Sequence, residues 1–182
     1  MKNSNLLKMI TLSMLVATGV VISPILRVEG LCPMAHFINI VASVLLGPYY
    51  SLLNAFLIAV LRMSLMGIPP LAITGAVFGA FFSGVFYRLS KGSIWAAVLG
   101  EITGTGIIGS IVFYPVMALL MGRNGLTWMF YTPSFILATF MGGSIAYIFL
   151  NALKANGMLY KIQYQLGVQK YEKSKSLFKH NK

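Results

Sequence analysis

Long apolar stretches separated by short polar or charged turns make up most of this chain. The apolar stretches run near residues 8–26, 35–47, 49–66, 71–89, 93–121 and 128–153. A helix needs about 20 mostly apolar residues to cross the hydrocarbon core of a bilayer. The pattern therefore predicts an all-α integral membrane protein, built as a bundle of six transmembrane helices.

The count of six depends on the region around Gly47 and Pro48. The second and third apolar stretches are short, and only Gly47-Pro48-Tyr49-Tyr50 separates them. Because Gly-Pro is a strong helix breaker, we expect two helices here. A single kinked helix, which would give five spans in total, is the alternative.

The distribution of basic residues favours six spans. With an even number of spans both termini lie on one side of the membrane, and Lys and Arg are enriched on the cytoplasmic side. The side of the termini would hold eleven basic residues and the other side three: Lys2, Lys8, Arg88, Lys91 and the seven lysines from Lys154 to Lys182, against Arg27, Arg62 and Arg123. We therefore expect a multi-pass protein of the cell membrane with both termini cytoplasmic.

Composition agrees with burial in lipid. Of 182 residues, 58% are hydrophobic and 9% charged, whereas a soluble domain carries about 25% charged residues. The net charge of +11 comes largely from the C-terminal lysines, which follow a hydrophobic span and so mark a cytoplasmic side rather than a nucleic-acid site. Two parts are predicted: a six-helix membrane domain over residues 1–156 and a basic cytoplasmic tail over residues 157–182.

Motifs for catalysis are missing from the sequence. It contains no Walker A loop, no paired aspartates, no H-E-x-x-H and no G-x-S-x-G. With three acidic residues, two histidines and Cys32 as the single cysteine, we expect no enzyme, no disulfide, no metal site and no cofactor. A membrane assembly protein and a small self-sufficient transporter remain alternatives, although no inverted repeat supports the latter.

Glu101 lies deep inside the fifth predicted span, in the run Leu99-Gly100-Glu101-Ile102-Thr103-Gly104-Thr105-Gly106. A charge at the bilayer centre costs roughly 2.5–3.5 kcal/mol on insertion scales, so such a residue faces a partner or a cavity. The glycines and threonines around it leave room for a ligand, which makes Glu101 and Thr105 candidate substrate contacts. The alternative is a buried structural pair with Arg62 or a neighbouring hydroxyl group.

His36 and Asn39 lie three residues apart, on one face of the second predicted helix. This pair is a candidate ligand contact near the external end, and ordinary packing is the alternative for His36. Arg62 lies near the external end of the third helix. Its side chain either snorkels to lipid headgroups or reaches inward to Glu101 or to a ligand.

Three aromatic residues are further candidates for contact with a flat ligand. Trp128 and Tyr131 open the sixth span on the external side, where aromatic side chains commonly form an interface belt; the alternative is a stacking lid over a heteroaromatic ring. Tyr114 precedes Pro115 within the fifth span. Proline there predicts a kink, and the Tyr114 hydroxyl can turn into the bundle.

Small residues recur four positions apart, which lets helix backbones approach closely in lipid. The pairs are Ser13/Ala17, Gly75/Gly79, Ala80/Gly84, Gly100/Gly104 and Gly142/Ala146. For most of them we expect packing within the bundle. Ser13 and Ala17 on the first helix also suit close approach of a helix from a partner subunit.

The sequence resembles the S components of energy-coupling factor (ECF) transporters, and within them the ThiW family, associated with the thiazole precursor of thiamine. The similarity covers nearly all of residues 8–153. The segments that carry it are Ile22-Ser23-Pro24, Pro33-Met34-Ala35-His36-Phe37-Ile38-Asn39, Leu45-Leu46-Gly47-Pro48-Tyr49-Tyr50, Arg62, Phe78-Gly79-Ala80, the run from Leu99 to Gly106, and Tyr114-Pro115.

This resemblance implies a six-helix subunit that docks on a transmembrane T subunit and two cytosolic ATPases. The ligand would be hydroxyethyl-methyl-thiazole, bound near the external face, and the small-residue stripe Ser13-x-x-x-Ala17 would be the docking surface. His36, Asn39, Glu101 and Tyr114 would serve the ring nitrogen and the hydroxyl group, and Trp128 or Tyr131 would stack on the ring. An S component for another vitamin or precursor is the alternative within this class.

Overall fold

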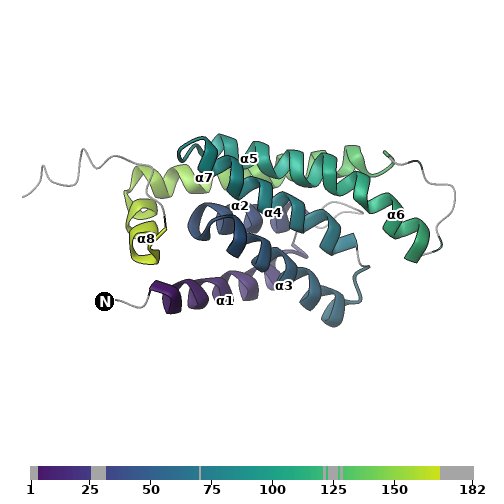
Figure 1. Cartoon of the computed structure of the whole chain (residues 1–182), viewed down its shortest axis with the longest axis horizontal. Coiled ribbons are helices and arrows are strands. Elements are labelled where there is room, and N and C mark those ends of the chain that lie inside the picture. The colour runs from purple at the N-terminus through teal and green to yellow at the C-terminus, as the bar shows by residue number, and fades with distance from the viewer. Residues whose placement is uncertain are drawn as a thin grey trace, which may run out of the picture.

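A bundle of long helices makes up the computed structural model, which describes residues 4–25, 32–69, 71–120, 122, 127 and 129–168, and no strand occurs in these ranges. Most of the helices lie roughly along one axis, and α8 stands across one end (Figure 1). The elements are α1 (Ser4–Ile22), α2 (Pro33–Leu46), α3 (Pro48–Met66), α4 (Leu71–Leu89), α5 (Ile94–Glu101), the π-helix η1 (Ile102–Gly109), α6 (Ser110–Leu120), α7 (Thr132–Ala155) and α8 (Met158–Leu166).

Five of the helical segments are long and apolar enough to cross a membrane. They are Ser4–Ile22, Pro48–Met66, Ala72–Leu89, Ile94–Leu119 and Thr132–Ala155, and the fourth of these joins α5, η1 and α6 into one span. The second predicted span is α2, which has 14 residues and is therefore about 21 Å long. That is shorter than the roughly 30 Å hydrocarbon core, so the predicted number of six depends on how α2 is counted.

The short helix α2 lies at the centre of the bundle. Eleven of its residues are buried, and it contacts α1, α3, α4, α5, α7 and α8. Its first turn lies beside the middle of α7, where a Cβ on Gly142 would be 2.9 Å from the Cβ of His36. Its last turn lies against α8, because Gln163 donates a hydrogen bond to the carbonyl oxygen of Val44 at 2.9 Å. Thus α2 runs from the middle of the bundle to the end where α8 lies.

A one-residue turn separates α2 from α3, and the predicted break between two helices is confirmed. Gly47 adopts φ 86° and ψ 176°, a conformation that L side chains rarely adopt. Pro48 follows at the first position of α3, where a proline costs no hydrogen bond. A Cβ on Gly47 would lie 2.5 Å from the guanidinium of Arg88, so glycine is required both by the turn and by this close approach.

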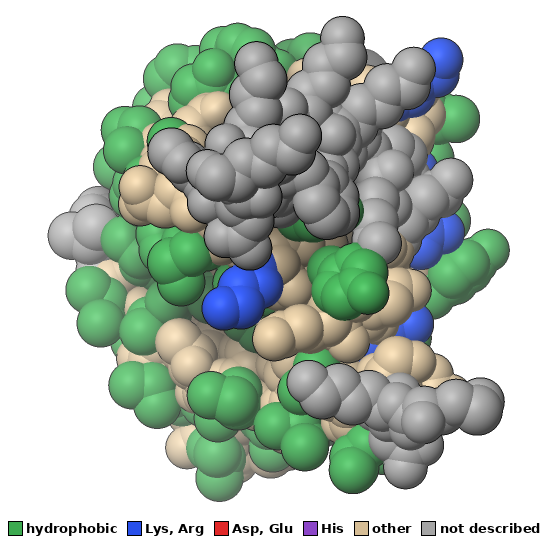
Figure 2. Space-filling model, turned by 90° about the vertical axis from the view of Figure 1, so that its left-hand side faces the viewer, with side chains coloured by type: hydrophobic (Ala, Val, Ile, Leu, Met, Phe, Trp, Pro, Cys, Tyr) green, Lys and Arg blue, Asp and Glu red, His purple; other side chains and the backbone are tan. Residues whose placement is uncertain are grey.

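Both ends of the described chain lie at the same end of the bundle. Gly167, just after α8, lies beside Ser4 at the start of α1, because a Cβ on Gly167 would be 3.3 Å from the Cβ of Ser4. Figure 2 looks onto this end and shows Lys and Arg side chains among hydrophobic ones. The basic residues of the segments that meet here are Lys8, Arg88, Lys91, Lys154 and Lys161. The first part of the segment expected to be a tail is therefore a packed helix, α8, with Leu159, Gln163 and Leu166 buried.

Candidate functional site

A fully buried carboxylate at the centre of the bundle collects three hydrogen-bond donors. One oxygen of Glu101, Oε1, lies 2.9 Å from Nδ1 of His36, 3.1 Å from Nδ2 of Asn39 and 3.2 Å from Oγ1 of Thr105. Glu101 is 0% exposed. Residues from α2, α5 and η1 therefore meet at one atom, and four of the predicted site residues are brought together.

Neighbouring backbone groups hold these donors in place. The single hydrogen of the Thr105 hydroxyl is shared between Oε1 of Glu101 and the carbonyl oxygen of Gly75, which is the nearer acceptor at 2.6 Å. Nδ2 of Asn39 also lies 3.3 Å from the carbonyl oxygen of Ala76. Ser51 on α3 donates to the backbone oxygen of Asn39 at 3.1 Å. The site is thus tied to α3 and α4 as well.

The carboxylate fits because the facing residue of α4 has no side chain. A Cβ on Gly79 would lie 2.7 Å from Oε1 of Glu101, and it would also overlap the hydroxyl of Thr105. A Cβ on Gly104 would in turn lie 2.7 Å from the Cα of Gly79. The expected packing through small residues on α4 and the fifth span is therefore observed directly at the site.

The π-helix η1 begins immediately after Glu101. It covers Ile102–Gly109 and includes Gly104, Gly106 and Gly109. Wider π turns are rare and occur frequently at functional sites. Sequence reasoning did not predict this element, although the run of alternating glycines after Glu101 was the signal for an irregular helix.

The second oxygen of Glu101, Oε2, is buried and has no hydrogen-bond partner among the described residues. The same holds for both side-chain polar atoms of Asn54, which is 0% exposed on α3. A buried polar group without a partner costs about 1–3 kcal/mol. When Glu101 is ionised its oxygens only accept hydrogen bonds, so Oε2 is suited to accept one from a ligand hydroxyl group.

Arg62 lies away from the carboxylate. Its side chain is 6% exposed, and Nη2 lies 3.4 Å from Sγ of Cys32, at the start of α2. Within the described ranges Glu101 pairs with His36, and the pair of Glu101 with Arg62 that was considered as an alternative is not formed.

The predicted aromatic residues lie apart from the carboxylate. Tyr131 packs edge-on against Phe113, with ring centroids 4.5 Å apart, and the two belong to a cluster with Phe135. That cluster borders the site, because a Cβ on Gly75 would lie 3.5 Å from Phe135 and 4.0 Å from Cγ2 of Thr105. Tyr114 is 37% exposed on α6, and Trp128 lies outside the described residues.

The outer face of α1 carries both candidate docking residues. Ser13 and Ala17 are exposed, and the Ser13 hydroxyl donates to the carbonyl oxygen of Met9 in its own helix at 3.0 Å. Neither side chain packs into the core cluster around α2. These residues can therefore face lipid or another helix.

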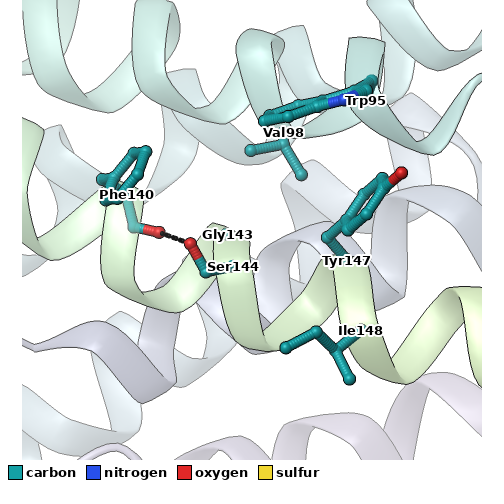
Figure 3. A pocket seen from close by; sticks show the side chains of 7 residues that line it. All are labelled: Trp95, Val98, Phe140, Gly143, Ser144, Tyr147 and Ile148. Atoms are coloured by element: carbon teal, nitrogen blue, oxygen red, sulfur yellow. Dashed lines mark hydrogen bonds between the residues drawn. The ribbon is translucent and has the colours of Figure 1, made fainter.

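A groove on the outside of the bundle lies between α5 and α7 and is separate from the carboxylate (Figure 3). Its volume is about 240 Å³, and its lining residues are Trp95, Val98, Phe140, Gly143, Ser144, Tyr147 and Ile148. None of these side chains is charged, and the Ser144 hydroxyl is turned to the carbonyl oxygen of Phe140 at 2.8 Å. The groove offers a mostly apolar surface, and the polar groups of its lining side chains are the Trp95 indole N–H, the Tyr147 hydroxyl and the Ser144 hydroxyl.

Comparison with known proteins identifies the family. Among curated proteins and among solved structures, no match to the chain was found. The family model described as thiamine-precursor transporter protein (ThiW) matches residues 9–156. This range includes most of α1, the helices from α2 to α7 and every residue that touches the Glu101 carboxylate. Because the match covers most of the sequence, the chain belongs to the ThiW family of thiamine-precursor transporter proteins.

Proposed function

We propose that this protein is the substrate-binding S component of an ECF uptake transporter, and that it captures hydroxyethyl-methyl-thiazole. Family membership supports a thiamine-precursor transporter of the membrane. The absence of a Walker A motif from the sequence supports energy supply by other subunits, namely a T subunit and two cytosolic ATPases. In this proposal the protein binds and releases its ligand without changing it chemically.

The observation that carries the proposal is the half-satisfied carboxylate of Glu101. Small-molecule sites combine apolar walls with a few oriented polar groups. Here three donors fix Oε1, and Oε2 is left to accept a hydrogen bond from the ligand hydroxyl group. A flat heteroaromatic ring would find its apolar wall at Phe113, Tyr131 and Phe135. Tyr114 and Trp128 stay predicted ligand contacts.

The topology that we propose counts α2 as part of a sixth crossing. The described part of this crossing is α2, which runs from the middle of the bundle to the end where α8 lies. Both termini would then be cytoplasmic, which agrees with the basic side chains at that end. The membrane domain would comprise residues 1–156, and residues 157–182 would form a cytoplasmic tail that begins with α8 along the membrane surface.

The experiment that tests this function is calorimetric titration of hydroxyethyl-methyl-thiazole into the detergent-purified protein. We expect Glu101→Ala to weaken binding at least tenfold, about 1.4 kcal/mol, because the ligand loses its oriented acceptor. Thr105→Val should weaken binding as well. Thr103→Val is the matched control, because among the described residues the Thr103 hydroxyl contacts the carbonyl oxygens of Leu99 and Gly100 in the preceding turn.

Two results would contradict the proposal. Unchanged affinity in a well-folded Glu101→Ala protein would make the Glu101 network purely structural. No binding of the thiazole, with another vitamin precursor recovered by mass spectrometry from the purified protein, would point to a different S component. If no small molecule bound at all, a membrane assembly protein would be the better description.

A further inference from the structure

Arg62 is a buried cation that has no anionic partner within the described part of the chain. Its side chain is 6% exposed, Nε has no hydrogen-bond partner there, and Nη2 lies 3.4 Å from the thiol sulfur of Cys32. Sulfur is a weak acceptor, and the Cys32 thiol is itself turned to the carbonyl oxygen of Ser23 at 2.9 Å. An uncompensated buried charge is strongly destabilising, so this guanidinium requires an anion.

The start of α2 adds a second positive feature at the same place. Cys32 is the N-cap residue of this 14-residue helix, and its side chain makes no capping hydrogen bond. A helix N-terminus carries about half a positive charge. Pro33 has no N–H group and Ala35 N–H donates to the carbonyl oxygen of Cys32 at 3.1 Å, so the helix contributes mainly its dipole and the guanidinium contributes the donors.

The position of this N-terminus inside the bundle excludes an ordinary role for Arg62 at the membrane surface. The first turn of α2 lies beside Gly142 near the middle of α7, and a snorkelling side chain would be exposed at the headgroup level. In transporters, N-termini of helices that end inside the membrane point at anionic groups of the substrate. The carboxylate of Glu101 does not fill this role, because among the described residues its oxygens lie beside His36, Asn39 and Thr105 and form no ion pair with Arg62.

The geometry points to a binding site for an anionic group, such as a phosphate monoester or a carboxylate, between Arg62 and the N-terminus of α2. This inference rests on the proposed function, since it concerns a second part of the same ligand site. Cys32 and His36 are four residues apart, which is about one helical turn or 6 Å. A small ligand can therefore reach both the Glu101 hydrogen-bond network and the Arg62 guanidinium, and the phosphate ester of the thiazole alcohol has the required charge.

The test compares two ligands that differ only in charge, hydroxyethyl-methyl-thiazole and its phosphate monoester, by calorimetric titration into the full-length protein in detergent. We expect Arg62→Gln to weaken binding of the ester at least tenfold and binding of the alcohol less than threefold. The ester affinity of Arg62→Lys should lie between those of the wild-type protein and Arg62→Gln. Lysine keeps the charge but lacks the planar guanidinium that binds phosphate with two hydrogen bonds. Lys161→Gln, which removes an exposed charge on α8, should change neither affinity.

The outcomes separate this inference from the proposed function. Failure of the wild-type protein to bind either ligand would overturn both. Normal binding of the alcohol, with a ratio of ester to alcohol affinity that Arg62→Gln leaves unchanged, would overturn the anion site alone. Two further results would also overturn it as a ligand site. One is a phospholipid that co-purifies with the wild-type protein and is lost in Arg62→Gln. The other is a gain in ester affinity in Glu29→Gln, which would identify the Glu29 carboxylate, outside the described residues, as the partner of Arg62. If Arg62→Gln does not fold, the Arg62→Lys protein carries the same comparison.

Discussion

At the residue scale, the absence of a side chain at Gly79 leaves the space that the Glu101 carboxylate occupies. We expect Gly79→Ala to displace this carboxylate and the Thr105 hydroxyl, because the new methyl group would lie 2.7 Å from Oε1 of Glu101. Overpacking of this kind costs about 1–3 kcal/mol. The predicted consequence is a lower melting temperature and weaker ligand binding, measured by thermal unfolding in detergent and by calorimetry.

Gly75→Ala is the matched control for this prediction. It lies one turn earlier on the same helix, and its Cβ would make an ordinary contact of 3.5 Å with the ring of Phe135. Both substitutions remove the same backbone freedom and differ in the space available. Equal behaviour of the two variants would contradict the prediction.

The polar residues of the site could be selected from the sequence, but their arrangement could not. A carboxylate inside an apolar span must find a partner, which singled out Glu101, and the helical spacing of His36 and Asn39 placed them on one face. That His36 rather than Arg62 pairs with Glu101 depends on the relative depth of α2 and α3, because His36 and Glu101 are far apart in the chain. The sequence also did not predict that Gly79 leaves room for the Glu101 carboxylate. The need for a glycine at that position is visible only when the facing residue on the neighbouring helix is known.

At the scale of elements, α8 forms hydrogen bonds with the ends of α2 and α4 that are cytoplasmic in the proposed topology. Gln163 donates to the carbonyl oxygen of Val44 at 2.9 Å, in the last turn of α2, and lies 3.0 Å from the hydroxyl of Tyr87 on α4. The last carbonyl oxygens of a helix have no partner within it. Gln163 thus satisfies a buried group that α2 cannot satisfy by itself.

We expect Gln163→Leu to lower the free energy of unfolding by about 1–3 kcal/mol, because it leaves a buried carbonyl oxygen without a donor. Gln165→Leu, two residues along the same helix and exposed, should have little effect. Thermal unfolding of the two purified variants measures the difference. A Gln163→Leu protein as stable as Gln165→Leu would show that the hydrogen bond from Gln163 to Val44 does not contribute to the stability of the bundle.

Hydropathy predicted most of the elements but not the irregular ones. The five long spans follow from the length of their apolar stretches, and the break at Gly47-Pro48 follows from the chemistry of these two residues. The π-helix η1 and the packed helix α8 were not predicted. Their cause lies in contacts with other parts of the chain: η1 packs against α4 and α7, and α8 closes over α1 and α2.

At the scale of the whole molecule, the docking surface expected on α1 would separate ligand binding from transport. Ala17 is exposed on the outer face of α1, away from the Glu101 site. If this face docks on the T subunit, Ala17→Trp should keep ligand binding within about threefold, which is less than about 1 kcal/mol, and abolish uptake. The bulky ring would hold the two helix backbones apart.

Two measurements check this prediction: calorimetry on the isolated Ala17→Trp protein, and uptake by cells that also express the T subunit and the ATPases. Leu53→Trp is the control, because Leu53 is also exposed, on α3 at 41%. Loss of both binding and uptake in Ala17→Trp would assign Ala17 to the core of the bundle. Normal uptake would remove the outer face of α1 from the mechanism.

The one-residue turn at Gly47 has a consequence for how the chain enters the membrane during synthesis. By itself α2 is too short to be released sideways from the translocation channel as a stable span, and it carries His36, Asn39 and Ser43. Because a single residue links α2 to α3, we expect the two helices to leave the channel together as a helical hairpin. In this hairpin α3 is long enough to cross the membrane and anchors both helices in it. The polar helix α2 is sheltered only when α4, α5 and α7 have followed. In the proposed function, the site at Glu101 is therefore covered only after α7 has inserted, and a chain that stops before α7 would leave the face of α2 that packs on α7 open to lipid.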